Sequence, residues 1–435
     1  MYRYEMRGKR ESVGNRFSER QLASIQHISS DERKMKMKYL VLIPDGAADY
    51  PIEALGKKTP LEAADKPTLD RLAKNSLVGT VSNVPSDMVP ESDTANLAIL
   101  SYDPKIYSKG RSPLEAMSMG LDMKPGDIAF RCNVVTVSEG EASYDDKIMI
   151  DHSADEITTE EAAELIKALE QAFGTEDRTF YSGVSYRHCM IWHNPPEYGN
   201  FSRPHDFPGK GVRDNMPVEP YAALIRKSYD ILNHHPINEA RRARGLRPAN
   251  SIWLWSPGAK PALSSFGDKW GLDASVISAV DLIKGIGICA GLESIDVCGA
   301  TGNYKTNYKG KADAAIDAFS RGKELVYVHV EAPDECGHRA ELENKVLSIS
   351  LISEKILKPI VEYLSGCGED YSVMVLPDHP TPICRRTHTL DPVPFMIYRS
   401  NLKQNGVSCF CEKEAAAKNY YIPHGYQLMS LLTGK

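Results

Sequence analysis

The sequence contains no uninterrupted run of about 18 apolar residues, the length that a membrane-spanning helix needs. The first residues, MYRYEMRGKRESVGNRFSER, are basic and polar and lack the apolar segment of a secretory signal. No CxxC pair occurs among the nine cysteines, and only Cys409 and Cys411 lie close together in the chain. These absences predict a cytoplasmic protein with reduced thiols and without a membrane partner.

An excess of positive charge is also missing. The chain has 52 Lys and Arg against 58 Asp and Glu, a formal net charge of -6 and a pI of about 6.1. Nucleic-acid-binding proteins usually carry a basic surface, so no nucleic-acid partner is expected. The composition, with 42% hydrophobic and 25% charged residues, is typical of a globular protein.

The length of 435 residues exceeds what one hydrophobic core usually accommodates, about 250–300 residues, so two domains are expected. Residues 1–38 are rich in charge and poor in apolar periodicity. They are predicted to be a disordered N-terminal extension, or to precede the true start site. From shifts in pattern we predict a discontinuous catalytic domain, 39–126 and 251–435, with an inserted domain at 127–250.

Three short, almost continuously apolar runs lead into Pro-Asp pairs. They are residues 39–43, 325–330 and 371–376, and they lead to Asp45, Asp334 and Asp378. Such runs suit strands that helices cover on both faces. The α/β pattern is interpreted as resuming at a further run, Ser251–Trp255. The predicted fold class is α/β, with a mostly parallel sheet core flanked by helices and a smaller inserted α/β domain.

Candidate metal ligands follow these strands. Ligands of parallel α/β sheets bind beyond the carboxyl ends of the strands, so the three Asp side chains are expected to gather there. Three imidazoles, those of His338, His379 and His388, lie close to the last two in sequence. Carboxylates and imidazoles together suit two divalent cations such as Mn²⁺ or Zn²⁺. For any single residue, a turn, cap or surface role is the commoner one, and spacing alone leaves that alternative open.

Ser92 is a candidate nucleophile. It lies where the polar turn Pro90-Glu91 leads into an apolar helix, Asp93–Leu100. On composition alone, an N-cap serine is the favoured interpretation. The same position would stabilise a phosphate on this hydroxyl, because a helix N-terminus offers free N–H groups to anions. Metal coordination would lower the pKa of the hydroxyl.

Several long motifs occur in a characteristic order, and together they closely resemble the cofactor-independent phosphoglycerate mutases. The resemblance is to the archaeal-type branch, within the alkaline phosphatase superfamily, and it runs from about Tyr39 to the C-terminus. The motifs are VLIPDGAAD at 41–49, PESDTANLAILSYDP at 90–104, GRSPLEA at 110–116, HVEAPDECGH at 329–338 and LPDHPTP at 376–382.

The resemblance implies the roles of the site residues and of the insert. Ser92 is expected to become phosphorylated, and the inserted domain to close over the substrate. Two divalent ions are expected, Mn²⁺ first, with Zn²⁺, Co²⁺ or Mg²⁺ as alternatives. One ion would be held by Asp45, Ser92, Asp378 and His379, and the other by Asp334, His338 and His388.

Basic side chains that resemble the family's substrate contacts are also present. Arginine binds planar anions with two hydrogen bonds, which suits a phosphate or a carboxylate. For each of them an ordinary surface role is about equally expected, and Asp151 would either orient a substrate hydroxyl or begin a turn. The candidates are Arg111, Arg131, Asp151, Arg187, His188 and Lys309.

The predicted activity is the interconversion of 3-phosphoglycerate and 2-phosphoglycerate in glycolysis and gluconeogenesis, through a phosphoserine. The small phosphorylated substrate is the one partner predicted, and the oligomeric state is left open.

A homoserine kinase-like phosphotransferase or a metal-dependent phosphatase of the same superfamily is the alternative, because metal ligands do not define the phosphoryl acceptor. A departure at Ser256–Lys260, less glycine-rich and less basic than expected of the mutases, lies where substrate would be chosen. A binding protein without activity is a third reading, opposed by the complete ligand set.

Overall fold

The computed structural model describes residues 37–435, and different stretches of the chain build its two β-sheets. The predicted N-terminal extension, 1–38, lies outside the described residues apart from its last two positions. Lys38 already belongs to the first strand. In the described part of the chain, every helix is too short or too polar to cross a membrane.

The first sheet has eight strands, and its centre is parallel. β1 (Lys38–Pro44) lies between β10 (Leu325–Val330) and β11 (Tyr371–Val375) and runs parallel to both. All residues of these three strands are buried, which explains their continuous apolar runs and confirms the three predicted strands. Beyond β10 follow β8 (Ala274–Ile277) and β9 (Glu293–Ile295), and beyond β11 follow β12 (Val393–Arg399), β2 (Leu77–Val81) and β13 (Tyr421–Ile422).

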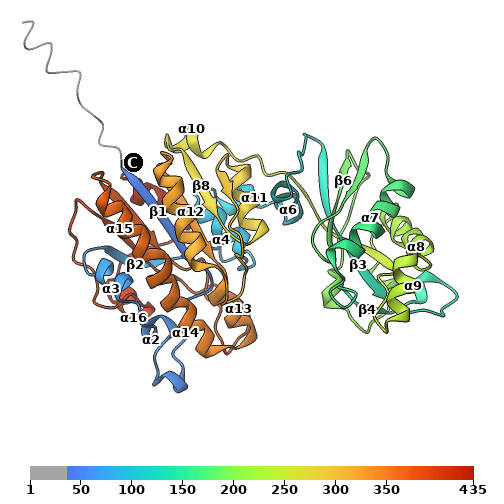
Figure 1. Ribbon diagram of the computed structural model, residues 1–435, viewed down its shortest axis with the longest axis horizontal. Coiled ribbons are helices and arrows are strands. Elements are labelled where there is room, and N and C mark those ends of the chain that lie inside the picture. Colours follow the sequence, from blue (N-terminus) through green and yellow to red (C-terminus); the bar gives the residue numbers. More distant parts are fainter. Residues whose placement is uncertain (1–36) are drawn as a thin grey trace, which may run out of the picture. The chain divides into compact units, whose positions relative to one another are not determined.

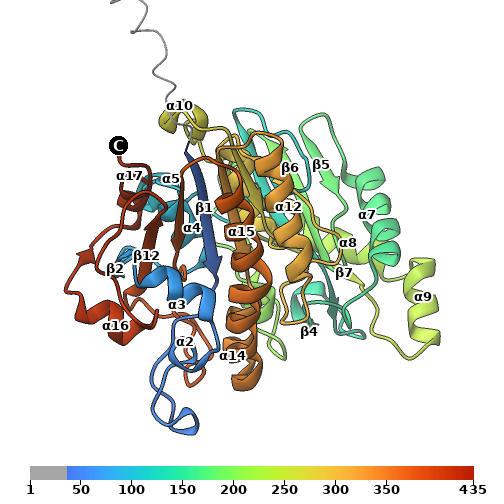
Figure 2. The ribbon, with the colours of Figure 1, turned by 60° about the vertical axis from the view of Figure 1, so that its left-hand side comes forward.

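Helices cover both faces of this sheet, as the fold class requires. Leu40 and Leu42 of β1 face one core, whereas Val41 and Ile43 face the other, because side chains alternate along a strand. On the first side α14 and α15 follow one another end to end, and α12 runs beside them in both Figure 1 and Figure 2. That core is built by α3 (Pro67–Ala73), α12 (Tyr308–Ser320), α14 (Leu342–Leu351), the π-helical turn η5 (Ile352–Leu357) and α15 (Lys358–Gly366), and the opposite one by α4 (Ser92–Ile99), α10 (Phe266–Trp270), α11 (Asp281–Cys289) and α17 (Leu428–Thr433).

The second sheet is antiparallel throughout, and the sequence left its strand directions open. β3 (Asp127–Val137) is its central strand, and β6 and β7 flank it. The sheet shares one core with three helices that lie beside it in Figure 1. The other elements are β4 (Met149–Asp151), β5 (Arg178–Tyr181), β6 (Arg187–His193), β7 (Ser251–Ala259), α7 (Thr159–Phe173), α8 (Tyr221–Leu232) and α9 (Pro236–Ala243).

Ser251–Trp255, where the sequence predicts that the α/β pattern resumes, belongs to the second, antiparallel sheet. This run is the start of β7, which pairs with β3 and places Trp255 opposite Arg131. A continuous apolar run shows that both faces of a strand are covered, but it does not show which sheet the strand joins. The second sheet therefore extends to Ala259, and the predicted domain boundaries stay predictions.

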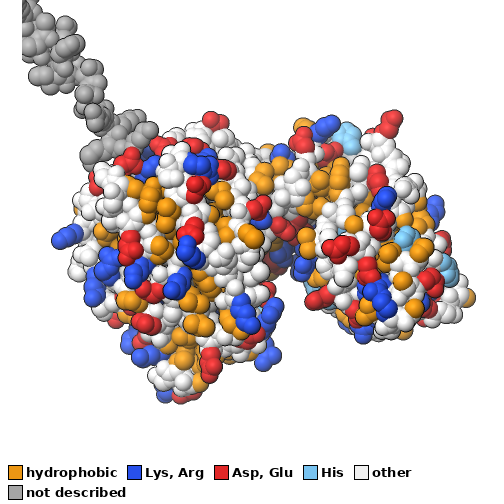
Figure 3. Space-filling model, in the orientation of Figure 1, with side chains coloured by type: hydrophobic (Ala, Val, Ile, Leu, Met, Phe, Trp, Pro, Cys, Tyr) orange, Lys and Arg blue, Asp and Glu red, His pale blue; other side chains and the backbone are white. Residues whose placement is uncertain are grey.

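Charged side chains of both signs are mixed over the face of the molecule that Figure 3 draws. The small formal net charge of -6 agrees with this mixture. Attraction of a small anion must therefore come from local groups in a site and not from the net charge of the chain.

Candidate active site

The three predicted carboxylates converge at the carboxyl ends of the central strands. Asp45 directly follows β1, Asp378 follows β11, and Asp334 lies in the first turn of α13 (Ala332–Arg339), after β10. All three are at most 5% exposed. They are expected to lie together because β1, β10 and β11 are adjacent and parallel. The structure thus brings together groups that are far apart in the chain.

Two histidines point at Asp334. His338 lies one helical turn after it on α13, and its Nε2 is 3.3 Å from Asp334 Oδ2. The Nε2 atom of His388 is 3.3 Å from Asp334 Oδ1 and 2.9 Å from His338 Nε2. The Nδ1 atoms of both rings face backbone carbonyl oxygens, those of Arg386 and Pro90, at 3.0 Å and 2.6 Å. A ring held in this way through Nδ1 presents Nε2 to a metal ion.

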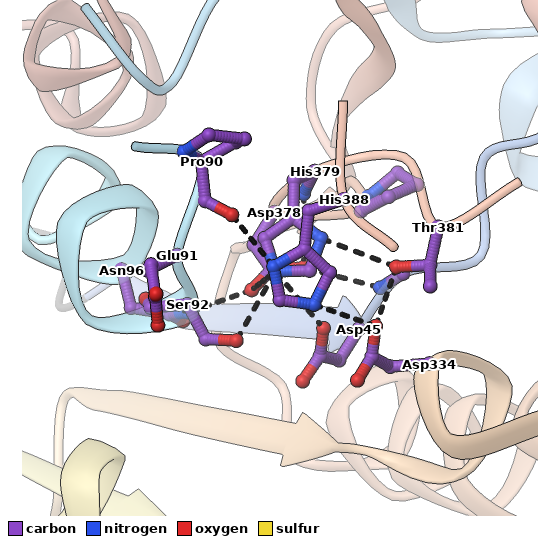
Figure 4. Close-up of polar contacts among 12 residues, drawn as sticks. Asp45, Pro90, Glu91, Ser92, Asn96, Asp334, Asp378, His379, Thr381 and His388 are labelled. Carbon is purple, nitrogen blue, oxygen red and sulfur yellow. Dashed lines mark hydrogen bonds and ion pairs between the residues drawn. The ribbon is translucent and has the colours of Figure 1, made fainter. Parts of the chain in front are cut away.

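The hydroxyl of Ser92 faces the other group of predicted ligands, which consists of Asp45, Asp378 and His379 (Figure 4). Ser92 is the first residue of α4, its side chain makes no capping hydrogen bond, and Glu91 is the N-cap. Its Oγ instead lies 3.1 Å from Nε2 of His379. The same nitrogen is 3.5 Å from Asp378 Oδ2 and 3.7 Å from Asp45 Oδ1. The N-cap interpretation of Ser92 is therefore wrong, and its hydroxyl lies among the predicted ligands.

His329 is a site residue that the sequence analysis missed. It is fully buried on β10, and its Nε2 lies 3.1 Å from Asp45 Oδ2. One potential ligand atom from each of His329, Asp45 and Asp378 lies within 4.8 Å of the other two. The available signal was an imidazole inside the apolar run Leu325–Val330, since buried polar groups in a strand need a partner.

A glycine is required at position 46 because the segments that carry Asp334 and Thr381 approach it closely. Its φ of +61° is in the left-handed region, and a Cβ atom there would lie 2.5 Å from Thr381 Oγ1 and 2.6 Å from Asp334 Oδ1. Any other residue would push the Asp334 carboxylate away from the site. The Gly46 N–H also donates to Asp378 Oδ1 at 3.1 Å.

The donor set fits divalent cations. Among the described residues, no lysine or arginine forms an ion pair with Asp45, Asp334 or Asp378. Asp45 Oδ1 and His329 Nε2 are buried without a hydrogen-bond partner. Burial, followed by repulsion from Asp378 and Asp334, raises the pKa of Asp45 well above its usual value. Buried carboxylates without a lysine or arginine partner, together with buried ligand atoms that lack hydrogen bonds, indicate a place for cations.

Protons bound to the imidazole rings balance part of the carboxylate charge in the protein without metal ions. The hydrogen bond to Asp334 raises the pKa of His338 to about 9, although burial opposes it. Burial alone would raise the pKa of Asp334, but hydrogen bonds from His338 and His388 outweigh it and lower that pKa well below its usual value. Because only a neutral imidazole binds a metal, cation binding must release protons from these rings.

Comparison with known proteins agrees with this chemistry. A family model described as 2,3-bisphosphoglycerate-independent phosphoglycerate mutase matches residues 73–238. An enzyme of that name from Methanosarcina acetivorans is 45% identical over 87% of this chain and 94% of its own. A probable one from Geobacter sulfurreducens is 42% identical over 91% of this chain and 99% of its own. The chain belongs to the 2,3-bisphosphoglycerate-independent phosphoglycerate mutase family.

Solved structures support the same mutase fold. A cofactor-independent phosphoglycerate mutase from Thermoplasma acidophilum matches with a TM-score of 0.62 and 26% identity, over 91% of this chain and 99% of that one. A Pyrococcus horikoshii protein matches with a TM-score of 0.76 and 27% identity, over 92% and 98% of the two chains. The mutase fold and the ligand clusters above imply divalent metal ions.

A buried lysine binds the loop of the mutase that follows β11 and carries Asp378 and His379. Lys345 on α14 donates to Asp49 Oδ2 and to the carbonyl oxygen of Thr381, both at 2.8 Å. The Thr381 hydroxyl in turn donates to Asp334. Lys345 and Asp49 have side chains that are 0% and 1% exposed, so each needs the other to remain charged in the interior.

Replacing Lys345 with methionine is expected to lower the free energy of unfolding by about 3–5 kcal/mol, because it leaves the Asp49 carboxylate buried and unpaired. The double variant Lys345→Met/Asp49→Asn should recover part of this loss, since the lone charge is gone. Urea denaturation of the two variants and of the parent measures both effects. Equal stability of the parent and the single variant would contradict the supporting role of the pair.

Three of the predicted anion-binding residues of the mutase share one cavity. Arg131, Arg187 and His188 line a cavity of about 480 Å³ together with Ser112. Arg131 forms a two-pronged ion pair with Glu115, at 2.6 Å and 2.5 Å. Arg187 forms no ion pair among the described residues and lies over the Tyr186 ring.

Two further groups have buried nitrogens without partners. Arg111 binds Glu91, the neighbour of Ser92, at 2.9 Å, and its Nε is buried without a hydrogen bond. His188 has a buried Nε2 without a partner. Burial lowers the pKa of this ring to about 3, so it is neutral at neutral pH.

Asp151 and Lys309 both bind groups close to them in the chain. This agrees with the turn role left open for Asp151 and with the surface role left open for Lys309. Asp151 accepts hydrogen bonds from the backbone N–H groups of Ser153 and Asp155 and from Arg247. These bonds lower its pKa to about 2 although burial opposes the shift. Lys309 has a side chain that is 80% exposed and pairs with Asp313 at 2.5 Å. Their roles as substrate contacts stay predictions.

Proposed function

We propose that the chain interconverts 3-phosphoglycerate and 2-phosphoglycerate, and that Ser92 carries the phosphoryl group between the two hydroxyls of glycerate. The observation that carries this proposal is the position of Ser92 Oγ, 3.1 Å from His379 within the carboxylate and imidazole cluster. Names of relatives that are 42–45% identical support the mutase reaction in particular.

The chain itself positions the nucleophile and the phosphate. Ser92 begins α4, whose first-turn N–H groups point towards the site and favour an anion. Asn96, one turn later, donates to the Ser92 carbonyl oxygen at 2.8 Å and to Asp378 Oδ2 at 2.9 Å. The hydroxyl is therefore fixed relative to the carboxylates before substrate arrives, which favours in-line attack.

Two divalent ions would be held by the residues already described. Asp45, Ser92, Asp378 and His379 would bind one, and Asp334, His338 and His388 the other, with Mn²⁺ expected first and Zn²⁺, Co²⁺ or Mg²⁺ as alternatives. When bound, such ions neutralise charge on the transferring phosphoryl group and lower the pKa of the serine hydroxyl. His329 is proposed to stabilise the Asp45 carboxylate next to this group.

The phosphoserine must be shielded from water while glycerate turns. We assign this role to the segment from β3 to β7, which provides Arg131, Arg187 and His188. The guanidinium groups of Arg131 and Arg187 would hold the carboxylate of glycerate so that it does not leave. Without this retention water would take the phosphoryl group, and the enzyme would act as a phosphatase.

An assay with three parallel reactions tests the proposal. The purified protein with Mn²⁺ is given 3-phosphoglycerate alone, ATP with homoserine, or a generic phosphomonoester. We expect rapid formation of 2-phosphoglycerate and little free phosphate. Transfer to homoserine, or stoichiometric release of phosphate from 3-phosphoglycerate, would overturn the mutase proposal and favour the corresponding alternative.

Replacing Arg187 with methionine is expected to raise KM for 3-phosphoglycerate by about 10–100-fold, because one charged hydrogen-bond donor is worth about 1.5–3 kcal/mol. The matched control is Arg213→Met, whose guanidinium is 60% exposed and paired with Asp146, and which should leave KM unchanged. Steady-state kinetics of both variants decide this. Equal kinetics for Arg187→Met and the parent would remove Arg187 from the substrate site.

A further inference from the structure

A cysteine pair outside the active site lies against a buried lysine. The segment that precedes α16 (Glu412–Ala417) runs along the C-terminal end of α3. Backbone N–H groups of Gln404, Gly406 and Val407 donate to carbonyl oxygens of Asn75, Lys74 and Ala73 at 3.1–3.2 Å. The Phe410 N–H donates to Asp70 Oδ1 at 2.8 Å. These bonds hold Cys409 and Cys411, on either side of Phe410, at fixed positions beside α3.

Lys66 is directed at the sulfur of Cys409. It is the N-cap residue of α3, its side chain is 0% exposed, and it pairs with Asp70 at 2.8 Å. Its Nζ lies 3.2 Å from Cys409 Sγ, within hydrogen-bond distance. Of the nine cysteines, all within the described residues, only Cys409 receives a hydrogen bond from a lysine or arginine side chain.

The two thiols are unequal. Cys409 is partly exposed, whereas Cys411 is buried. The neighbouring Cys411 thiol, followed by the charge of Lys66, lowers the pKa of Cys409 to about 6, although burial and the repulsion from Asp70 oppose this shift. The Cys409 sulfur and burial raise the pKa of Cys411. Cys409, held 3.2 Å from the Lys66 ammonium, is therefore the more readily ionised sulfur of the two.

We propose that Cys409 is a modification site for soft electrophiles and peroxides, with Cys411 as its resolving thiol. An accessible thiolate beside a second, protonated thiol is the arrangement of redox-sensitive cysteines. The buried Lys66 ammonium is shared between the Asp70 carboxylate and the Cys409 sulfur. Neither cysteine belongs to the metal or substrate groups described above.

The chemistry with hydrogen peroxide balances in two steps. The Cys409 thiolate attacks one oxygen of the peroxide, the O–O bond breaks, and sulfenic acid and hydroxide form. The Cys411 thiol then attacks the Cys409 sulfur, an S–S bond forms, and the sulfenic oxygen leaves as water with the thiol proton. Peroxide is the oxidant, and two electrons pass to it from the two sulfurs.

Alkylation of the full-length protein with iodoacetamide, followed by peptide mass spectrometry, tests the thiolate. We expect the rate at Cys409 to level off near pH 7, because it is already ionised there. The exposed Cys298, Cys367 and Cys384 serve as internal controls, because none of them receives a hydrogen bond from a lysine or arginine side chain in the described part of the chain. In the Lys66→Met variant, the pH at which the alkylation rate of Cys409 levels off should rise by about 1 unit. A Cys409 profile in the parent protein that follows those of the exposed cysteines overturns the proposal, whether or not the variant folds.

Dilute peroxide tests the resolving role. We expect a Cys409–Cys411 disulfide in the parent, trapped Cys409 sulfenic acid in Cys411→Ser, and neither product in Cys409→Ser. Cys384→Ser is the matched control and should behave as the parent does. Because neither cysteine contacts the catalytic groups, Cys409→Ser should keep mutase turnover. Oxidation of the three exposed cysteines as fast as Cys409 would overturn the proposal.

Discussion

Replacing Ser92 with alanine is expected to lower kcat of the mutase reaction by at least about 10⁴-fold, because the variant has no group to carry the phosphoryl moiety. The fold should survive, since the Ser92 side chain caps no helix and its one hydrogen bond within the described structure is to His379. Coupled assays of 2-phosphoglycerate formation measure the loss.

Two further measurements separate a lost carrier from a damaged protein. Incubation with ³²P-labelled substrate and rapid acid quenching should label the parent and leave Ser92→Ala unlabelled. Ser320→Ala, at an exposed hydroxyl that binds only Asp317, should be labelled like the parent. Wild-type turnover in Ser92→Ala would remove the phosphoserine from the mechanism.

Removing the divalent ions is expected to abolish turnover and to destabilise the fold. The site keeps three buried carboxylates together, so the metal-free protein loses their neutralisation. Metal at 100 times its Kd should stabilise the protein by about 2.7 kcal/mol relative to the chelated form. Activity and thermal unfolding before and after EDTA, and again after addition of Mn²⁺, measure both effects.

Asp45→Asn is the informative control for this experiment. Asp45 Oδ1 has no hydrogen-bond partner, and burial with repulsion from Asp378 raises the pKa of Asp45, so the neutral amide resembles its preferred metal-free state. The metal-free variant should be at least as stable as the metal-free parent, yet respond more weakly to Mn²⁺. A metal response equal to that of the parent would exclude Asp45 as a ligand.

Local patterns predicted the framework of the site because its geometry follows from strand order. The runs before Asp45, Asp334 and Asp378 are buried on both faces, and parallel neighbours necessarily end at one edge. His338 was within reach because it lies one helical turn after Asp334.

Other features depend on contacts that sequence patterns do not encode. The apolar run Ser251–Trp255 does not show that β7 joins the antiparallel sheet, because hydrophobicity reports burial and not the pairing partner. In the sequence His329 is one residue of an apolar strand. Only the structure shows that Asp45 lies beside it. Nothing in the sequence around Lys345 and Lys66 indicates burial, yet both are buried against groups far along the chain, Asp49 and Cys409. Only tertiary packing reveals why these lysines are tolerated inside.

The position of β1 has a consequence for biosynthesis. It is the first strand that the ribosome produces in the described chain, but its neighbours β10 and β11 are among the last. At about 5–20 residues per second, β10 follows β1 by roughly 15–60 s. During that interval a strand made for complete burial has neither of its pairing partners, and the nascent polypeptide is exposed to aggregation until translation is nearly finished.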